Sequence, residues 1–138
     1  MDKLTADHRS ANMAQIRSKD MKPELIVRRV VHSLGYRYRI HRRDLPGKPD
    51  LAFGPRKKIV FVHGCFWHQH PNPNCLDGRA PKSNLSYWVP KLKRNLERDR
   101  QHLQALHKAG WRTLIIWECE TKKLPSLRRR LVRFLGPR

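Results

Sequence analysis

The stretch Lys57-Lys58-Ile59-Val60-Phe61-Val62-His63-Gly64-Cys65-Phe66-Trp67-His68-Gln69-His70 runs from an apolar segment directly into a segment of reactive side chains. Residues 57–62 are rich in β-branched and apolar types, which predicts a strand that ends at Gly64. Three His and two Cys lie within the fifteen residues from Phe61 to Cys75. Imidazoles and thiols this dense are not ordinary core. We interpret the stretch as a strand that carries a catalytic His to its end and then enters a metal-bound loop.

The remaining pattern predicts an α/β domain with the element order αβββαβ and a final helix. Apolar residues recur at helical spacing from Ile26 to Leu34, with Asp20 as the expected N-cap and Gly35 as the end. We expect strands at 36–40, 49–53 and 111–117, the last one largely buried. Long helices are expected from about 84 to 109, capped by Asn84 or Ser86, and from 125 to 135. The apolar stripe of the first of these is Leu92, Leu96, Leu103 and Leu106.

Three successive strands with short turns, followed by a helical crossover to a fourth, favour a mixed sheet flanked by helices. That is the layout of the restriction-endonuclease-like nuclease core. A length of 138 residues predicts a single domain. We expect residues 19–138 to form the core. Residues 1–18 are expected to form an arm with a short helix, which either docks on the domain or contacts DNA through the face that carries Met13.

Composition indicates a nucleic-acid partner. The chain has 31 Lys and Arg against 11 Asp and Glu, a formal charge of +20. Four Trp and clear apolar periodicity favour a folded nuclease or reader over a basic tail, and an anionic membrane surface is the weaker alternative. We find no apolar run long enough to span a bilayer and no secretory signal, and therefore expect a cytoplasmic protein. An odd count of three Cys then favours metal ligation over disulfides.

Phosphodiester cleavage needs a hard cation, oxygen ligands and a group that activates water. Pro49-Asp50 matches the Pro-Asp motif of this nuclease core, although most such pairs are simply turns. No acid stands two residues before His63, so the metal would need the backbone oxygen of Val62. His63 replaces the usual Lys and can transfer a proton near neutral pH. Glu24 is either a favourable first-turn charge or part of the metal shell.

A second site is expected where the thiols gather. Cys65, His70, Cys75 and Cys119 form a Cys₃His set that suits tetrahedral zinc. The alternative is three buried thiols and a surface His. His68 is free for catalysis or lies on the surface.

The quoted stretch, together with Leu45-Pro46-Gly47-Lys48-Pro49-Asp50, Pro81-Lys82-Ser83, Tyr87-Trp88, Asn95, Arg98-Asp99 and Gly110 to Cys119, resembles the very short patch repair endonucleases of bacteria. This family nicks DNA on the 5′ side of a thymine mispaired with guanine, the product of 5-methylcytosine deamination, and uses magnesium. The resemblance implies a monomer acting on double-stranded DNA. A paired cytosine methyltransferase and mismatch-repair proteins are candidate partners.

The resemblance also implies residue roles. Asp50 and the carbonyl of Val62 would hold Mg²⁺, with Glu24 in the outer shell, and His63 and His68 would flank the cleaved phosphate. DNA contacts are expected from Met13, Phe66, Trp67, Trp88, Lys91 and Asn95, and structural Zn²⁺ from the Cys₃His set. Cys75 comes five residues after His70, whereas the family commonly has two, so its ligand role stays open. A restriction-type nuclease without mismatch preference and a zinc-stabilised DNA-binding module are the alternatives.

Overall fold

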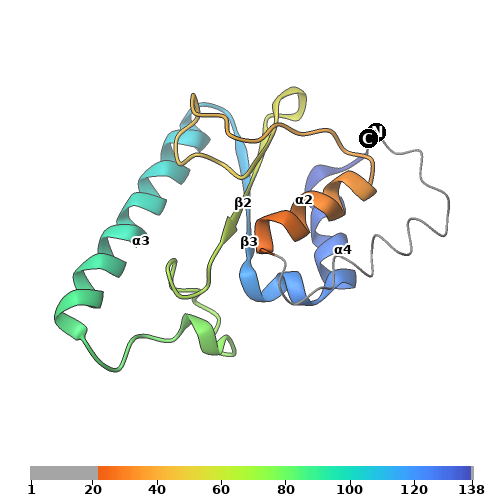
Figure 1. Cartoon of the computed structure of the whole chain (residues 1–138). Coiled ribbons are helices and arrows are strands. Elements are labelled where there is room, and N and C mark those ends of the chain that lie inside the picture. The colour runs from red at the N-terminus through yellow and green to blue at the C-terminus, as the bar shows by residue number, and fades with distance from the viewer. Residues whose placement is uncertain (1–21, 138) are drawn as a thin grey trace.

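A small mixed sheet forms the centre of the computed structural model, which describes residues 22–137. Strand β1 (Leu51–Phe53) pairs antiparallel with β2 (Lys58–His63), and β2 pairs in parallel with β3 (Arg112–Trp117). Helix α3 (Leu85–Lys108) is the crossover between the parallel strands and covers one side of the sheet. Helices α2 (Pro23–Ser33) and α4 (Leu124–Leu135) cover the other side (Figure 1). The predicted α/β architecture, a mixed sheet flanked by helices, is confirmed.

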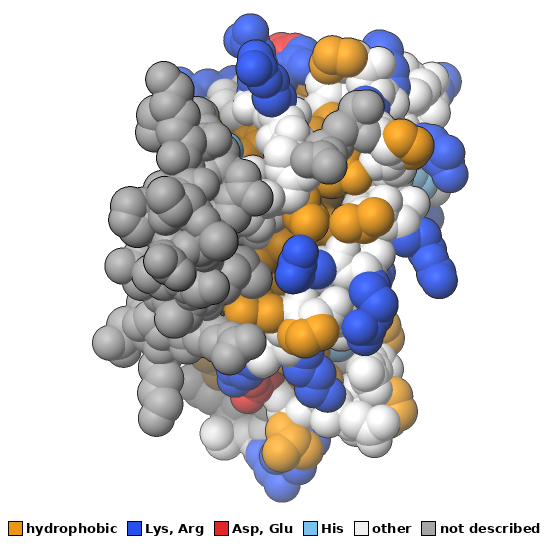
Figure 2. All heavy atoms as spheres, turned by 90° about the vertical axis from the view of Figure 1, so that its right-hand side faces the viewer, with side chains coloured by type: hydrophobic (Ala, Val, Ile, Leu, Met, Phe, Trp, Pro, Cys, Tyr) orange, Lys and Arg blue, Asp and Glu red, His pale blue; other side chains and the backbone are white. Residues whose placement is uncertain are grey.

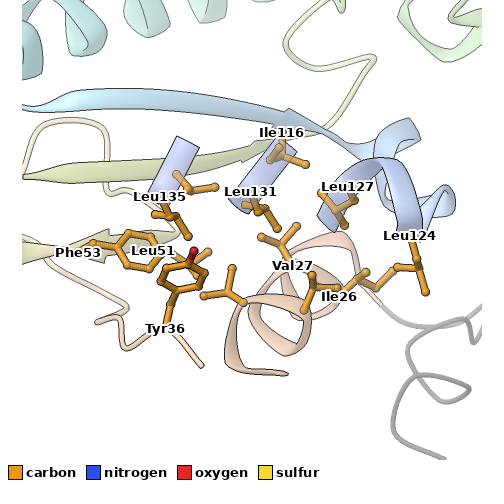
Figure 3. Close-up of a cluster of buried hydrophobic side chains, with 13 residues drawn as sticks. Ile26, Val27, Tyr36, Leu51, Phe53, Ile116, Leu124, Leu127, Leu131 and Leu135 are labelled. Atoms are coloured by element: carbon orange, nitrogen blue, oxygen red, sulfur yellow. The ribbon is translucent and has the colours of Figure 1, made fainter. Parts of the chain in front are cut away.

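Successive side chains along each strand point to opposite faces of the sheet and contribute to two separate hydrophobic cores. Val60, Ile116 and Leu51 face α2 and α4, where they pack with Val27, Leu131 and their neighbours (Figure 3). Ile59 and Phe61 face α3 and pack with Leu106 and Trp111. Because side chains alternate between the two faces, His63 follows Ile59 and Phe61 onto the α3 side. The end of β2 therefore presents its imidazole toward α3.

The predicted strand at 36–40 is wrong. Arg39 alone forms a bridge, exchanging two backbone hydrogen bonds of 2.9 Å with Ala52. Tyr36 instead closes the end of α2, since its N–H donates to the carbonyl of Val31. His41 then adopts a left-handed backbone with φ of 58°, which is incompatible with a continuing strand. The described order is therefore αββαβα.

Helix α3 does not bury every residue of the apolar stripe that its sequence predicts. Leu92 and Leu106 are buried, but Leu96 is 44% exposed. A helix of 24 residues is about 36 Å long, whereas a six-residue strand spans about 20 Å, so much of α3 extends beyond the sheet. Asn84 occupies the N-cap position but makes no side-chain capping bond. Lys22 is the N-cap of α2, and Asp20 lies outside the described residues.

Strand β3 is less buried than predicted. Only Ile116 of its six residues is fully buried, because β3 pairs with β2 alone and forms an edge of the sheet. The last helix agrees with its pattern: Leu127, Leu131 and Leu135 are buried, and the arginines at 128, 129, 130 and 133 are exposed.

The surface is strongly cationic. In Figure 2, Lys and Arg side chains far outnumber the acidic ones on the face shown. Within residues 22–137, none of the helices combines the length and apolar composition needed to cross a bilayer.

Candidate active site and metal centre

A cavity of about 210 Å³ opens at the end of β2, on the side that faces α3. Because β1 runs antiparallel to β2, the residue that precedes β1 lies beside the last residues of β2. The cavity is thus lined from several elements: Gly47, Lys48, Asp50, Phe61, Val62, His63, His68, Asp99, His102 and Leu103. The structure therefore brings the predicted Asp50, His63 and His68 to one place.

Asp50 is fixed against the backbone of β2. Its Oδ2 accepts a hydrogen bond of 2.6 Å from the N–H of Val62. The N–H and C=O of one strand residue point to the same edge, so the carbonyl of Val62 is also directed toward Asp50. Burial raises the pKa of the Asp50 carboxyl, the Val62 hydrogen bond opposes this, and the charge of Glu24 raises it further. Two oxygen donors of the kind that hard cations prefer meet here, with a second carboxylate nearby.

The two histidines form a stacked pair. The rings of His63 and His68 lie 3.8 Å apart at 10°. Nδ1 of His68 lies 2.5 Å from Oδ2 of Asp99 on α3. Burial, together with the smaller effect of His68 and against the opposing effect of Asp99, lowers the pKa of His63 to about 4. His63 is therefore neutral at pH 7 and can accept a proton.

Asp99 is a site residue that sequence reasoning missed. One acid among the many charges of a long polar helix is not distinctive by its residue type alone. The usable signal was its spacing: Asn95, Asp99 and His102 recur at intervals of four and three on one face of α3. Of these, Asp99 and His102 line the cavity.

A second cluster of potential metal ligands lies beyond the ends of β2 and β3. One ligand atom from each of Cys65, His70, Cys75 and Cys119 lies within 4.8 Å of all the others. Sγ of Cys119 lies 3.5 Å from Nδ1 of His70, and burial raises the pKa of the Cys65 thiol to about 12. The first three follow β2 and Cys119 follows β3, so the parallel pairing brings them to the same edge of the sheet.

The shifted spacing of Cys75 does not remove it from the cluster. The four residues between His70 and Cys75 lead into a turn in which the N–H of Cys75 donates to the carbonyl of Asn72 at 3.0 Å. The side chain of Asn72 also accepts from the N–H of Asn74 at 2.9 Å. The loop thereby returns a buried Cys75 to the other three side chains. Three thiols and one imidazole are a donor set that fits zinc.

An aromatic wall stands on the outer side of the same loop, which we define as Phe66, Trp67, Tyr87 and Trp88. Their rings contact one another edge to face, with centroids 4.8 to 5.8 Å apart. Trp67 is 45% exposed and Tyr87 50% exposed. Nζ of Lys91 lies about 5 Å from both of these rings. Nδ2 of Asn95 donates to the carbonyl of Trp67 at 3.4 Å, and Met13 lies outside the described residues.

We compared the sequence with models of known protein families. The model of the DNA mismatch endonuclease Vsr matches residues 1–74, more than half of the chain. The chain belongs to the Vsr family. It is therefore a Vsr-like DNA endonuclease, as the resemblance of its motifs predicted.

Individual relatives are similar to this chain beyond residue 74 as well, over nearly its whole length. A type II nicking enzyme, V.XorIIP of Xanthomonas oryzae pv. oryzae, is 47% identical over 99% of this chain and 98% of its own length. V.NmeAIP of Neisseria meningitidis, another type II nicking enzyme, is 40% identical over 97% of this chain and 94% of its own. The DNA mismatch endonuclease Vsr of Escherichia coli is 36% identical over 86% of this chain and 72% of its own.

Proposed function

We propose that the chain is a magnesium-dependent endonuclease that nicks double-stranded DNA on the 5′ side of the thymine in a T·G mismatch. The observation that carries the proposal is the cavity at the end of β2, where Asp50 and Val62 lie beside the stacked pair His63 and His68. The name of the Escherichia coli relative supports action at a mismatch, and the names of the others support nicking. We infer a monomer that works in the bacterial cytoplasm.

Asp50 and the carbonyl of Val62 would hold the magnesium, with Glu24 as an outer carboxylate. Bound magnesium stabilises the charge that develops on the phosphate. The partly buried carboxylate of Asp50 is held in place by the N–H of Val62, so it keeps its orientation. The restriction-endonuclease-like relationship of the core remains a prediction.

The two histidines have different surroundings, which suggests different roles. Asp99 contacts Nδ1 of His68, and its carboxylate stabilises a positive charge on that ring. Nε2 of His68 is then the nitrogen available to donate a proton to the leaving oxygen. His63 is surrounded by the rings of Phe61, His68 and Trp117, and we infer that it accepts a proton from the attacking water.

The aromatic wall suits the recognition of a mismatch. We infer that Phe66, Trp67 and Trp88 wedge into the base stack, with Lys91 beside them and Met13 reaching the DNA from the arm. A mismatched pair stacks less well than a matched pair, so the few kcal/mol needed to unstack it are reduced. Asn95 binds the backbone of Trp67, and we infer that it supports the wedge in addition to meeting DNA. Zinc at Cys65, His70, Cys75 and Cys119 would hold the loop from behind.

The direct test is incubation of a labelled T·G duplex with the protein in magnesium, followed by mapping of any nick. The paired twin of the same sequence is the control, and a chelator arm tests the need for metal. A nick 5′ of the mispaired thymine is expected. Equal cutting of both duplexes would instead indicate a restriction-type nuclease. Binding without scission would indicate a zinc-stabilised DNA-binding module.

A further inference from the structure

The loop before Pro49 forms one wall of the catalytic cavity, and the proposed chemistry leaves it without a role. Gly47 and Lys48 line the cavity from this loop, and His102 lines it from α3. The proposed metal, proton-transfer and wedge residues include none of these three.

The backbone of this loop is held in an unusual conformation. Gly47 has φ of 80° and Lys48 has φ of 48°, so two consecutive residues are left-handed. That region is unfavourable for a residue with a Cβ, and such outliers cluster at functional sites. A Cβ on Gly47 would lie 3.0 to 3.1 Å from three atoms of His102. The loop backbone therefore packs directly against the imidazole of His102.

Charge decides what the loop can bind. Two carboxylates, Asp50 and Asp99, line the cavity and would repel the DNA backbone. Of the described residues that line it, Lys48 is the one Lys or Arg. Within residues 22–137 its side chain has no ion-pair partner and is exposed. An ammonium group in that position is free to contact a phosphate.

We propose that Lys48 binds a DNA phosphate next to the cleaved bond and that His102 positions it by supporting the loop at Gly47. The inference deepens the proposed function and rests on it. Lys48 contacts the substrate, whereas His102 acts through the loop and is a positioning residue.

The first test compares Lys48→Met with Lys57→Met. Lys57 is a matched control because it is also exposed and left-handed, with φ of 53°, but stands at the opposite end of β2 over the ring of Trp111. We expect Lys48→Met to slow nicking of a T·G duplex by roughly 10–100-fold, the range of one charge-assisted bond. The slope of log binding constant against log salt should fall by about 1. Lys57→Met should keep the wild-type rate.

The salt slope is measured by binding alone, so it separates two failures. A wild-type chain that binds DNA but does not nick it overturns the proposed function. An unchanged slope in Lys48→Met overturns the phosphate contact, whatever the nicking result.

The second test separates packing from proton transfer at His102. His102→Ala should lower both the nicking rate and the salt slope, and adding it to Lys48→Met should cause little further loss. His102→Phe keeps a flat ring against Gly47 and should restore most of the rate. If His102→Phe is folded and as inactive as His102→Ala, the ring nitrogens matter and the positioning role is overturned.

Discussion

Asp50 combines three properties at one residue: burial, a backbone hydrogen bond from β2 and a second carboxylate nearby. We predict that Asp50→Asn abolishes nicking and leaves binding to a T·G duplex largely intact. The carboxylate is the proposed metal ligand, whereas affinity comes mostly from Lys and Arg on phosphates. Rates and binding constants measured on the same duplex check this.

Asp44→Asn is the matched control for that change, because Asp44 is exposed and paired with Arg42 outside the cavity. It should keep wild-type activity. Wild-type nicking by Asp50→Asn would contradict the metal-ligand role.

The stacked histidines give a second prediction at this scale. His63→Ala should lower the single-turnover nicking rate by roughly 10²–10⁴, the range for a positioned acid or base. His68→Ala and Asp99→Asn should each lower the rate, and their double variant should resemble His68→Ala alone because Asp99 acts through His68. His107→Ala, an exposed His on α3 bonded to Thr113, serves as the control. Additive losses in the double variant would show that Asp99 has a separate role.

At the scale of elements, the loop after β2 and the start of α3 form the aromatic wall together. We predict that Trp67→Ala weakens binding to a T·G duplex by about 1–3 kcal/mol, the range for one stacked base, with little change in salt slope. Tryptophan fluorescence should be quenched by the T·G duplex and much less by its paired twin. Val132→Ala removes an exposed apolar side chain on α4 instead and should change neither. A folded Trp67→Ala with unchanged rate and mismatch preference would mean that the wall is packing.

Helices and strands were predictable where the spacing of apolar residues in the sequence equals the spacing of buried residues in the structure. The run before His63 became β2, and the spacing of Leu127, Leu131 and Leu135 became the buried face of α4. The alternation at Tyr36–Ile40 predicted a strand that does not form, because a strand needs a pairing partner along its length and only Arg39 has one. The prediction that Leu96 lies on the buried face of α3 was wrong. The spacing of apolar residues in a long helix carries no information about where the sheet beneath it ends.

At the scale of the whole molecule, the cluster of Cys65, His70, Cys75 and Cys119 joins the ends of the two parallel strands. We predict one tightly bound zinc per chain, lost in Cys65→Ser and in Cys119→Ser. Structural zinc supplies about 10–16 kcal/mol in small peptides, against about 5–15 kcal/mol for the stability of a typical domain. Chelation should therefore lower the unfolding midpoint strongly. Elemental analysis that finds no zinc in pure, active protein would contradict the prediction.

The two sites differed in how far the sequence could specify them. Asp50 directly precedes β1, His63 ends β2 and His68 follows β2, so their proximity followed from the pairing of two neighbouring strands. Cys119 stands far from Cys65 in the chain, and its place in the cluster depended on a parallel pairing that no local pattern encodes. The turn at Asn72 that returns Cys75 could not be read from spacing, because loop geometry is set by its own hydrogen bonds.

The parallel pairing of β2 with β3 also imposes an order in time on the newly made chain. Cys65, His70 and Cys75 leave the ribosome close together, whereas Cys119 arrives only after all of α3 has been synthesised. Loop-closure entropy must be lost before β3 docks, so Cys119, the proposed fourth zinc ligand, would join the other three late. A nascent chain would hold the metal through three ligands and exchange it readily. Slow metal exchange would then mark the molecules in which β3 has reached its place.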